Sequence, residues 1–347
     1  MSTKRTEPGA DVHGARPRAA GSTMTAVGRD TYGSADLLEV RTVPRPIAVG
    51  GDVLVAVSDA GLDRGAWHVM TGQPYLMRVA GFGFRRPKNP GIGSELAGVV
   101  EAVGPDVTGL AVGDAVFGIG RASFAEYALA SPGKLAPMPA NLTCEQAAAV
   151  PVSGLTALQA LRDKGRVQGG QSVLIIGASG GVGTLAVQIA KALGAEVTGV
   201  CSTAKTDLVR SLGADHVVDY TAGDISTGNR RYDLVLDIGG NRSLTTLRRL
   251  LTPRGTLVIV GGEGGGRWFG IGRQLRAIAL SPFVRQRLVT FIASENSDDL
   301  GTLRTMIEAG AVTPVIDRVC SLPEVPDAMR DLEAGRVRGK VVVAIRP

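Results

Sequence analysis

The sequence predicts an α/β protein of two domains, one built on a doubly wound parallel sheet and one on a smaller β structure. Between residues 171 and 293, short apolar strands alternate with helical segments, which is the pattern of a parallel sheet covered by helices. Before residue 140, short strands are instead broken by Gly and Pro, a spacing typical of a compact, partly closed β domain. At 347 residues the chain is long enough for two cores.

The first domain is expected over residues 24–145. Residues 1–23 are rich in Gly, Ala, Arg and Pro without apolar periodicity, so they predict a disordered tail, and Met24 is a plausible second start. The segment 75–90 mixes apolar and basic residues; it is either a loop over a cleft or a plain solvated loop. The β-branched runs that predict strands in this domain are 52–58, 96–103, 114–117 and 124–129.

The second domain is expected over residues 146–319, after a helical connector at 144–164. Helices are predicted at about 205–212 and 242–251 between its strands. A helix at 323–335 and a last apolar strand from Lys340 follow; since this strand has no partner of its own, residues 320–347 are expected to complete the first domain. The six runs that predict the parallel sheet are 171–176, 196–200, 216–219, 232–237, 255–260 and 288–293.

A glycine-rich turn, residues 177–183, lies between the first strand of this sheet and the next helix. Glycines there allow a tight turn, close approach of the backbone to a pyrophosphate, and close packing of helix against strand. Gly180 and Gly183 hold the later glycine positions. The helix N-terminus adds free N–H groups and a positive dipole end. An ordinary surface turn is the alternative, but the strand–turn–helix context favours a dinucleotide site at the C-terminal edge of the sheet.

The end of the second strand indicates which dinucleotide. A ribose with a free 2′-hydroxyl is usually held by an acid about 20 residues past the turn, and this chain has none there. Ser202, Thr203 and Lys205 offer hydroxyls and an ammonium instead, which suits the 2′-phosphate of NADP(H). Alternatively, Ser202 and Thr203 cap the following helix.

The composition argues against several other classes of protein. The net charge is +6, but no long Lys/Arg run and few aromatic residues are present, so nucleic acid is not an expected partner. Three dispersed cysteines without a CxxC pair fit a reducing cytoplasm. No apolar run is long enough to span a membrane, so stable insertion is not expected. The basic, apolar segment 264–287 is either a membrane-surface helix or, more simply, an excursion beside the cleft or at a subunit contact.

In the order of its motifs, the chain from residue 24 to residue 347 resembles the medium-chain dehydrogenase/reductase superfamily, in its zinc-independent, quinone-oxidoreductase-like branch. The resemblance implies a GroES-like β domain that contains both chain ends, with a Rossmann domain inserted between them and a homodimer as the assembly. The motifs that carry it are residues 93–104 (GSELAGVVEAVG), 113–118 (GDAVFG), 177–183 (GASGGVG), 212–220 (LGADHVVDY) and 339–342 (GKVV).

The resemblance also bears on metal. Family members with catalytic zinc carry Cys, His and Cys where this chain has Asp63, Ser94 and Val152, and one Asp cannot supply the three ligands that such a site needs. No metal is therefore expected. A simple ketone or alcohol concentrates alkoxide charge that zinc stabilises. A quinone or enone spreads that charge by conjugation, so hydrogen-bond donors and a positioned hydride suffice.

The site residues follow from matching positions in similar enzymes. On the substrate side, Asp63 either orients substrate or relays a proton, or simply stabilises a turn; Tyr75 either donates to the substrate oxygen or packs. The cofactor-binding candidates are Gly180, Gly181 and Val182 for the phosphates, Ser202, Lys205 and Tyr220 for the 2′-phosphate, Thr156, Gly261 and Ala293 for the nicotinamide, and Lys340.

The leading hypothesis is an NADPH-dependent, zinc-independent reductase of quinones or α,β-unsaturated carbonyls, acting on a small electrophile. Two alternatives remain open from the sequence. One is a broad-specificity NAD(P)-dependent alcohol or aldehyde dehydrogenase. The other is a catalytically weak NADPH-binding sensor or membrane-associated scaffold, which residues 264–287 motivate.

Overall fold

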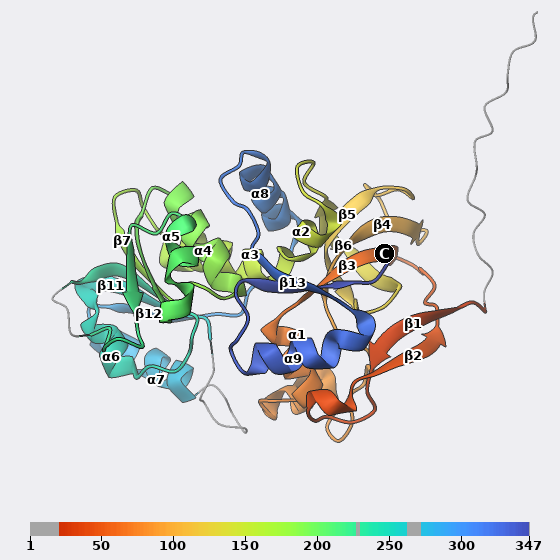
Figure 1. Cartoon of the computed structure of the whole chain (residues 1–347), viewed down its shortest axis with the longest axis horizontal. Coiled ribbons are helices and arrows are strands. Elements are labelled where there is room, and N and C mark those ends of the chain that lie inside the picture. The colour runs from red at the N-terminus through yellow and green to blue at the C-terminus, as the bar shows by residue number, and fades with distance from the viewer. Residues whose placement is uncertain (1–20, 227–229, 262–271, 347) are drawn as a thin grey trace, which may run out of the picture.

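The computed structural model describes residues 21–226, 230–261 and 272–346. Figure 1 shows two bodies, the parallel sheet with its helices on the left and the β domain on the right, with α3 between them. Most of the predicted N-terminal tail lies outside the described residues, and the first strand already begins at Thr23. The α/β fold class, a GroES-like β domain with a Rossmann-type domain, is confirmed.

The β domain contains a hairpin and a six-stranded sheet. The sheet runs in the order β13-β14-β3-β4-β5-β6, and β3 also pairs with β6, which closes part of it into a barrel. The C-terminal strand β14 lies antiparallel to β3, between it and β13. The strands are β1 (Thr23–Gly28), β2 (Glu39–Pro44), β3 (Val53–Leu62), β4 (Glu95–Val103), β5 (Ala115–Arg121), β6 (Tyr127–Pro137), β13 (Ile316–Ser321) and β14 (Lys340–Ala344).

The Rossmann-type sheet is parallel, with the order β12-β11-β10-β7-β8-β9. Successive strands run outward from β7 in one direction and from β10 in the other, so the order reverses between these neighbours. Crevices at such a reversal bind ligands outside the carboxyl ends of the strands. The strands are β7 (Ser172–Ile176), β8 (Glu196–Cys201), β9 (His216–Asp219), β10 (Tyr232–Asp237), β11 (Leu251–Ile259) and β12 (Arg287–Thr290).

The helices differ in detail from the sequence pattern. The connector is two helices, with Pro151 at the first turn of the second, where a missing N–H costs nothing. The helix expected from Lys205 begins as a 3₁₀ turn, Thr203–Lys205, and becomes regular only at Thr206. The helices are α1 (Arg64–Thr71), α2 (Cys144–Ala148), α3 (Pro151–Gln159), α4 (Gly181–Ala192), α5 (Thr206–Ser211), α6 (Leu244–Arg249), α7 (Gly272–Leu280), α8 (Ser297–Glu308) and α9 (Val325–Glu333).

One hydrophobic core runs through α3 and joins the two domains. It includes Phe117 of β5, Leu155 of α3 and Ile175 of β7, all essentially without exposed surface. Because packed side chains resist displacement, this continuity fixes how the parallel sheet faces the β domain. No helix among the described residues is long and apolar enough to cross a membrane.

Candidate cofactor and substrate cleft

The glycine turn between β7 and α4 has the geometry of a phosphate cradle. Gly177 has φ +90°, and a Cβ on Gly183 would lie 2.0 Å from the Gly177 carbonyl oxygen, so both positions require glycine. Gly180 is the N-cap of α4 and has no side chain to cap it. A Cβ on Gly180 would meet only the Gly177 oxygen, at 3.7 Å. The N-terminus of α4 is thus open to an anion.

A cleft of about 480 Å³ runs between the two domains along this turn. It brings together ten of the twelve site residues expected from the sequence, whose individual roles stay predictions. These ten are Asp63, Thr156, Gly180, Gly181, Val182, Ser202, Lys205, Tyr220, Gly261 and Lys340.

Tyr75 does not line this cleft. The Arg78 guanidinium lies over its ring at 4.5 Å. Arg78 also donates to the carbonyl oxygens of Gly72 and Thr71, and the Tyr32 hydroxyl donates to that of Phe82. These bonds hold the segment that contains Tyr75, which does not line the cleft, so its donation to substrate stays a prediction.

Ala293 also lies outside the cleft wall. Apolar sequence continues to Ala293, but strand β12 ends at Thr290. The apolar run therefore overstated the strand by three residues, and Ile292 is 98% exposed. Gly261, by contrast, follows β11 directly and packs closely, since a Cβ there would lie 2.1 Å from the Ile238 oxygen.

The charges in the cleft suit a polyanionic cofactor. Among the residues that the structure describes, its wall carries four cationic side chains, those of Arg64, Lys205, Arg242 and Lys340, and one acid, Asp63. NADP(H) brings a pyrophosphate and a 2′-phosphate, so this excess of positive charge and the open helix N-terminus fit the group.

The residues after β8 define the end of the cleft where the adenosine ribose is expected. No acid of this segment lines the cleft. Asp219 of β9 instead accepts hydrogen bonds from the hydroxyls of Thr203 and Thr221. Ser202 makes no capping hydrogen bond, so the alternative that it merely caps the next helix is wrong.

Two backbone carbonyl groups of the protein hold the Lys205 side chain in place. Its Nζ donates to the carbonyl oxygens of Gly335 at 3.0 Å and Val337 at 2.8 Å. Burial lowers the pKa of this ammonium, with Arg338 acting in the same direction. An ammonium has three N–H groups, so one is left for a phosphate oxygen.

Asp63 stands where the cleft meets the β domain. Its Oδ1 accepts from the Ala66 N–H at 2.7 Å and so caps α1, while Ser94 Oγ lies 3.4 Å from Oδ2. Asp63 therefore has the structural role that the sequence offered as an alternative, since it caps a helix, and it also lines the cleft. Within residues 21–226, 230–261 and 272–346, no group of three or more His, Cys, Asp or Glu side chains is arranged to hold a metal ion.

Glu95 lies behind the cleft wall, in contact with Lys340, and sequence reasoning missed it. It is fully buried, forms an ion pair with Lys340, and accepts from the Val152 N–H at 2.8 Å. Burial raises the pKa of Glu95 to about 7, against the opposing effect of Lys340. Lys340 in turn lies against the glycine turn, where a Cβ on Gly181 would be 2.8 Å from its Cδ. In the sequence, the one signal for Glu95 is its place between Gly93 and Gly98 in the motif of residues 93–104.

Arg242 is a second residue that was missed. It lines the cleft beside Asn241, just past β10, and lies 3.5 Å from the Asp224 carboxylate. Its position could have been found from the rule that residues following the carboxyl ends of parallel strands line the crevice.

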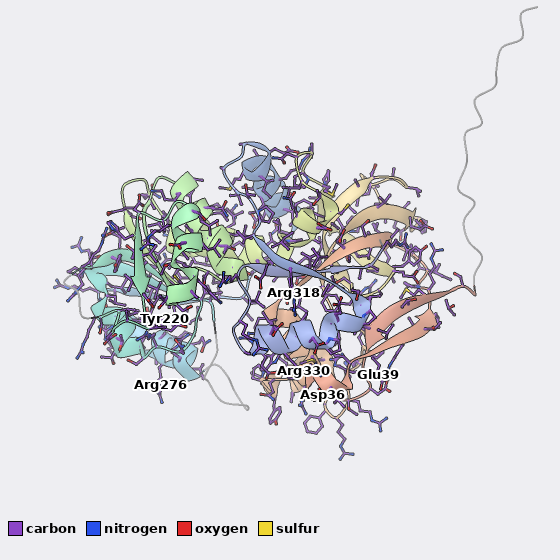
Figure 2. All side chains as sticks on the ribbon, viewed as in Figure 1. Asp36, Glu39, Tyr220, Arg276, Arg318 and Arg330 are labelled. Atoms are coloured by element: carbon purple, nitrogen blue, oxygen red, sulfur yellow. The ribbon has the colours of Figure 1, made fainter. Side chains whose placement is uncertain are left out.

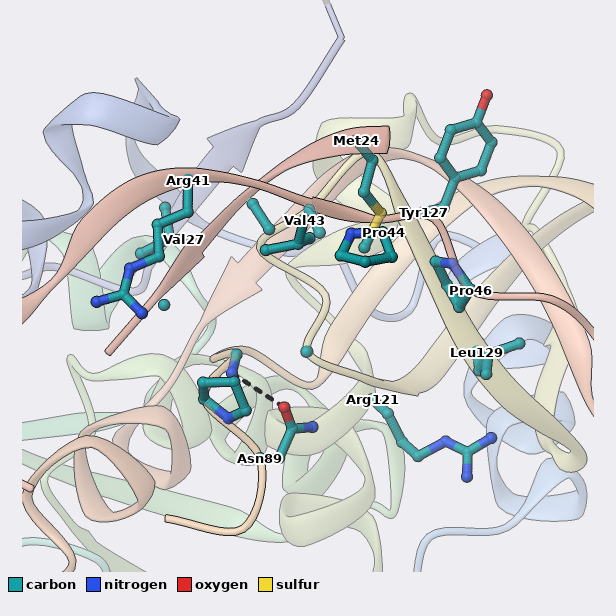
Figure 3. Close-up of a pocket in the computed structure, with 16 residues that line it drawn as sticks. Met24, Val27, Arg41, Val43, Pro44, Pro46, Asn89, Arg121, Tyr127 and Leu129 are labelled. Carbon is teal, nitrogen blue, oxygen red and sulfur yellow. Dashed lines mark hydrogen bonds between the residues drawn. The ribbon is translucent and has the colours of Figure 1, made fainter. Parts of the chain in front are cut away.

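The β domain contains a separate cavity of about 360 Å³ (Figure 3). Apolar residues of β1, β2 and β6 line it, and Arg41 and Arg121 stand at its rim. Both guanidiniums are neutralised, by Asp30 at 2.7 Å and by Asp52 at 2.6 Å. None of the predicted site residues lies here, so the cofactor argument concerns the interdomain cleft alone.

This fold and cleft define an oxidoreductase of the two-domain, dinucleotide-binding kind. Residues 50–140 match the family described as alcohol dehydrogenase GroES-like domain, and residues 212–343 the one described as zinc-binding dehydrogenase. The chain belongs to the medium-chain dehydrogenase/reductase superfamily, in its quinone-oxidoreductase-like branch.

Curated relatives agree with this assignment. The mouse protein "NAD(P)H oxidoreductase RTN4IP1, mitochondrial" is 35% identical over 279 residues, which are 73% of this chain and 70% of the relative. A tomato 2-methylene-furan-3-one reductase is 31% identical over 338 residues, 93% of this chain and 79% of the relative. The polyketide synthase protein NorB of Streptomyces orinoci is 37% identical over 264 residues, 74% of this chain, but this match spans only 12% of NorB.

Solved structures match along nearly the whole chain. A quinone oxidoreductase from Coxiella burnetii has a TM-score of 0.82 at 28% identity, covering 94% of this chain and 100% of that one. Mycobacterial Rv1454c complexed with NADPH has a TM-score of 0.79 at 27% identity, covering 92% and 99%. The protein is thus an NAD(P)H oxidoreductase of the quinone-reductase type.

Proposed function

We propose that this protein is an NADPH-dependent, zinc-independent reductase that transfers hydride to a quinone or an α,β-unsaturated carbonyl compound. The observation that carries the proposal is the cleft wall, whose described residues include four cations and one acid, beside a helix N-terminus at Gly180 that no side chain caps. The similarity to a quinone oxidoreductase, an enone-type reductase and an NADPH complex supports it.

In this proposal each part of the cleft has a separate task. The backbone N–H groups at Gly181 and Val182 bind the pyrophosphate. Ser202, Lys205 and Tyr220 hold the 2′-phosphate, for which Lys205 supplies a charge-assisted hydrogen bond. Thr156 and Gly261, which both line the cleft, position the nicotinamide. When bound, NADPH supplies the hydride.

The substrate side is poorer in polar groups. Asp63 is the only acid among the described residues that line the cleft, and it can hold a proton at Oδ2 while Oδ1 caps α1. Near Asp63, the positions that carry zinc ligands in related enzymes hold Ser94 and the Val152 side chain. A conjugated acceptor, whose developing negative charge is delocalised, matches such a site better than a simple ketone does.

Two further features are part of the proposal. We propose a homodimer in which the edge strand β12 pairs with its copy, because Ile292, just past that edge, would then be covered. We also propose a cytoplasmic location, since Cys144, Cys201 and Cys320 are all free thiols.

The function is tested with purified protein, both dinucleotides and three substrates: a short-chain quinone, an enone and a primary alcohol. Turnover with NADPH and either conjugated acceptor is expected, without loss on treatment with a chelator. Alcohol oxidation that a chelator abolishes would support the alternative of a broad-specificity alcohol or aldehyde dehydrogenase. Tight NADPH binding without oxidation by any acceptor would support the sensor or scaffold alternative.

A further inference from the structure

Two stretches of the chain contain basic residues and no acid. Between Arg64 and Ser94 there is no Asp or Glu and there are five Lys or Arg residues. Between Gly272 and Ser294 there is again no acid, and there are four arginines. Since acids are frequent in the chain, 32 in all, these stretches give the protein two locally positive regions.

The same stretches carry half of the large apolar side chains that are exposed among the described residues. In the first, Val79 is 70% and Phe84 is 71% exposed, with Leu76 and Phe82 beside them in the chain. In the second, on α7 and the 3₁₀ turn after it, Leu275, Ile278 and Phe283 are 52%, 55% and 84% exposed. Every exposed phenylalanine of the described chain lies in one of these two stretches.

The cations among these apolar residues are free to act on a partner. Arg276 and Arg285 are exposed and form no ion pair with another residue that the structure describes. The same holds for Arg85 and Lys88 in the first stretch. Arg276 lies at the lower edge of the molecule, as does the chain that follows α1 (Figures 1 and 2). We call the exposed residues of the first stretch, together with those of the second stretch that precede β12, the basic apolar surface.

This surface adjoins the cleft on both sides. The first stretch begins with Arg64 and includes His68, which line the cleft on α1. In the second, Arg273 of α7 donates to the carbonyl oxygen of Gly261 at 2.7 Å, and Gly261 lines the opposite wall. Whatever the basic apolar surface contacts is therefore near the substrate site.

We propose that the basic apolar surface docks the protein reversibly on an anionic lipid membrane, with the cleft beside the lipid. Exposed aromatic and aliphatic residues among unpaired arginines are the composition of interfacial membrane contacts. The substrate class that follows is a lipophilic quinone or enone that partitions into the membrane. This assignment of substrate rests on the proposed reductase function. Docking then presents the cleft where such a substrate is concentrated.

A second copy of the chain is a poorer occupant. A two-fold interface places the same patch against itself, so the unpaired arginines would face each other with no acid in either stretch to compensate them. An anionic bilayer complements both the charge and the apolar residues.

The test is cosedimentation with vesicles, because it requires no turnover. The wild-type protein is expected to bind vesicles of equal parts phosphatidylcholine and phosphatidylglycerol, to bind phosphatidylcholine alone far more weakly, and to be released by high salt. Arg276→Glu combined with Arg285→Glu should lower the partition coefficient at least about 25-fold, since each basic residue contributes roughly a factor of five. Phe283→Ser should lower it as well.

Val49→Ser and Val112→Ser serve as matched controls, because both valines are 63% exposed in the β domain outside the basic apolar surface. Both should bind vesicles like the wild type. Equal binding to neutral and anionic vesicles, no binding to either, or equal losses in the controls would overturn the proposal. So would conversion of a dimer to a monomer by Phe283→Ser in sedimentation velocity, which would make this surface a contact between copies.

Turnover separates this inference from the proposed function. With a short-chain, water-soluble quinone, the Arg276 and Phe283 variants should keep the wild-type kcat. With a long-tailed quinone embedded in anionic vesicles, they should lose rate. If vesicle binding fails while the soluble quinone is still reduced, the membrane proposal is wrong and the reductase assignment stands.

Discussion

Glu95 and Lys340, the first residues of β4 and β14, form an ion pair that is almost completely buried beside the glycine turn. The second Glu95 oxygen accepts from the Val152 N–H at the start of α3. The backbone adds to this contact, since the Gly339 N–H donates to the Ser179 carbonyl oxygen at 2.8 Å. The C-terminal strand, the barrel and the phosphate turn are thus tied together at one point.

The first prediction tests this pair. Glu95→Leu leaves the Lys340 ammonium buried without a partner, so the free energy of unfolding in urea should fall by about 3–5 kcal/mol. Adding Lys340→Met should recover most of the loss, because two apolar side chains of similar size need no charge compensation. The control, Glu39→Gln, removes an exposed ion pair with Arg41 and should cost less than about 1 kcal/mol. A double variant no more stable than Glu95→Leu would contradict this account.

The second prediction concerns pH. Burial, reinforced by Glu145, raises the pKa of Asp59 from its ordinary 3.8 to about 6. Between these values the native state keeps a proton that the unfolded state has released, so stability falls as pH rises through this window. Asp59→Asn should therefore melt at a higher temperature than the wild type at pH 8, and the difference should vanish towards about pH 4. A difference that grows on acidification would reverse the sign and refute the assignment.

The fold could be predicted because its signals are local. Apolar runs, glycine punctuation and the order of strands and helices gave the six-stranded parallel sheet and the separate β domain. The misjudged boundaries lie at segment ends. The predicted strand extends to Ala293, but β12 ends at Thr290. The predicted helix begins at Lys205, one residue before α5 does. Hydrogen bonding rather than apolar character decides where an element begins and ends.

The parts of the candidate site that backbone geometry determines could be predicted from the sequence. The parts that depend on contacts between side chains could not. The glycine turn and Ser202 follow directly from strands and lie in the cleft as expected. Tyr75 lies outside the cleft wall, in a segment that bonds from Tyr32 and Arg78 hold, and its role stays a prediction. Glu95 was missed because its partner is 245 residues away in the chain, a pairing with no local signature.

Cofactor selectivity is the third prediction. Lys205→Ala should raise the Kd for NADPH about 10- to 100-fold and leave that for NADH nearly unchanged, because only NADPH carries the 2′-phosphate that a charge-assisted hydrogen bond stabilises. Fluorescence titration measures both constants. Lys191→Ala is the matched control, since this lysine is on the far end of α4 and pairs with Asp215. Equal losses for both dinucleotides would show that Lys205 only supports Gly335 and Val337.

The fourth prediction separates the two tasks of Asp63. Asn caps helices as well as Asp does but exchanges no proton, so Asp63→Asn should keep the melting temperature and lower kcat about 10²-fold. Asp63→Ala should in addition lose about 1 kcal/mol of stability, because the Ala66 N–H loses its acceptor. Unchanged kcat in Asp63→Asn would leave Asp63 as a structural cap alone.

The last prediction distinguishes two glycines of the same turn. Gly180 has an extended φ of −88°, which any residue adopts, and a Cβ there meets no atom closer than 3.7 Å. The free protein should therefore tolerate Gly180→Val with little change in melting temperature. The branched side chain would nonetheless occupy the space at the α4 N-terminus where the pyrophosphate is expected, so NADPH binding should collapse.

Gly183→Val should behave differently, because its Cβ would stand 2.0 Å from the Gly177 oxygen and force the turn apart. Loss of stability rather than a selective loss of affinity is expected for this variant, as measured by thermal melting. The pair of variants thus separates space kept for a ligand from space needed by the fold. A well-folded Gly180→Val protein that binds NADPH normally would mean that the phosphates do not lie at this turn.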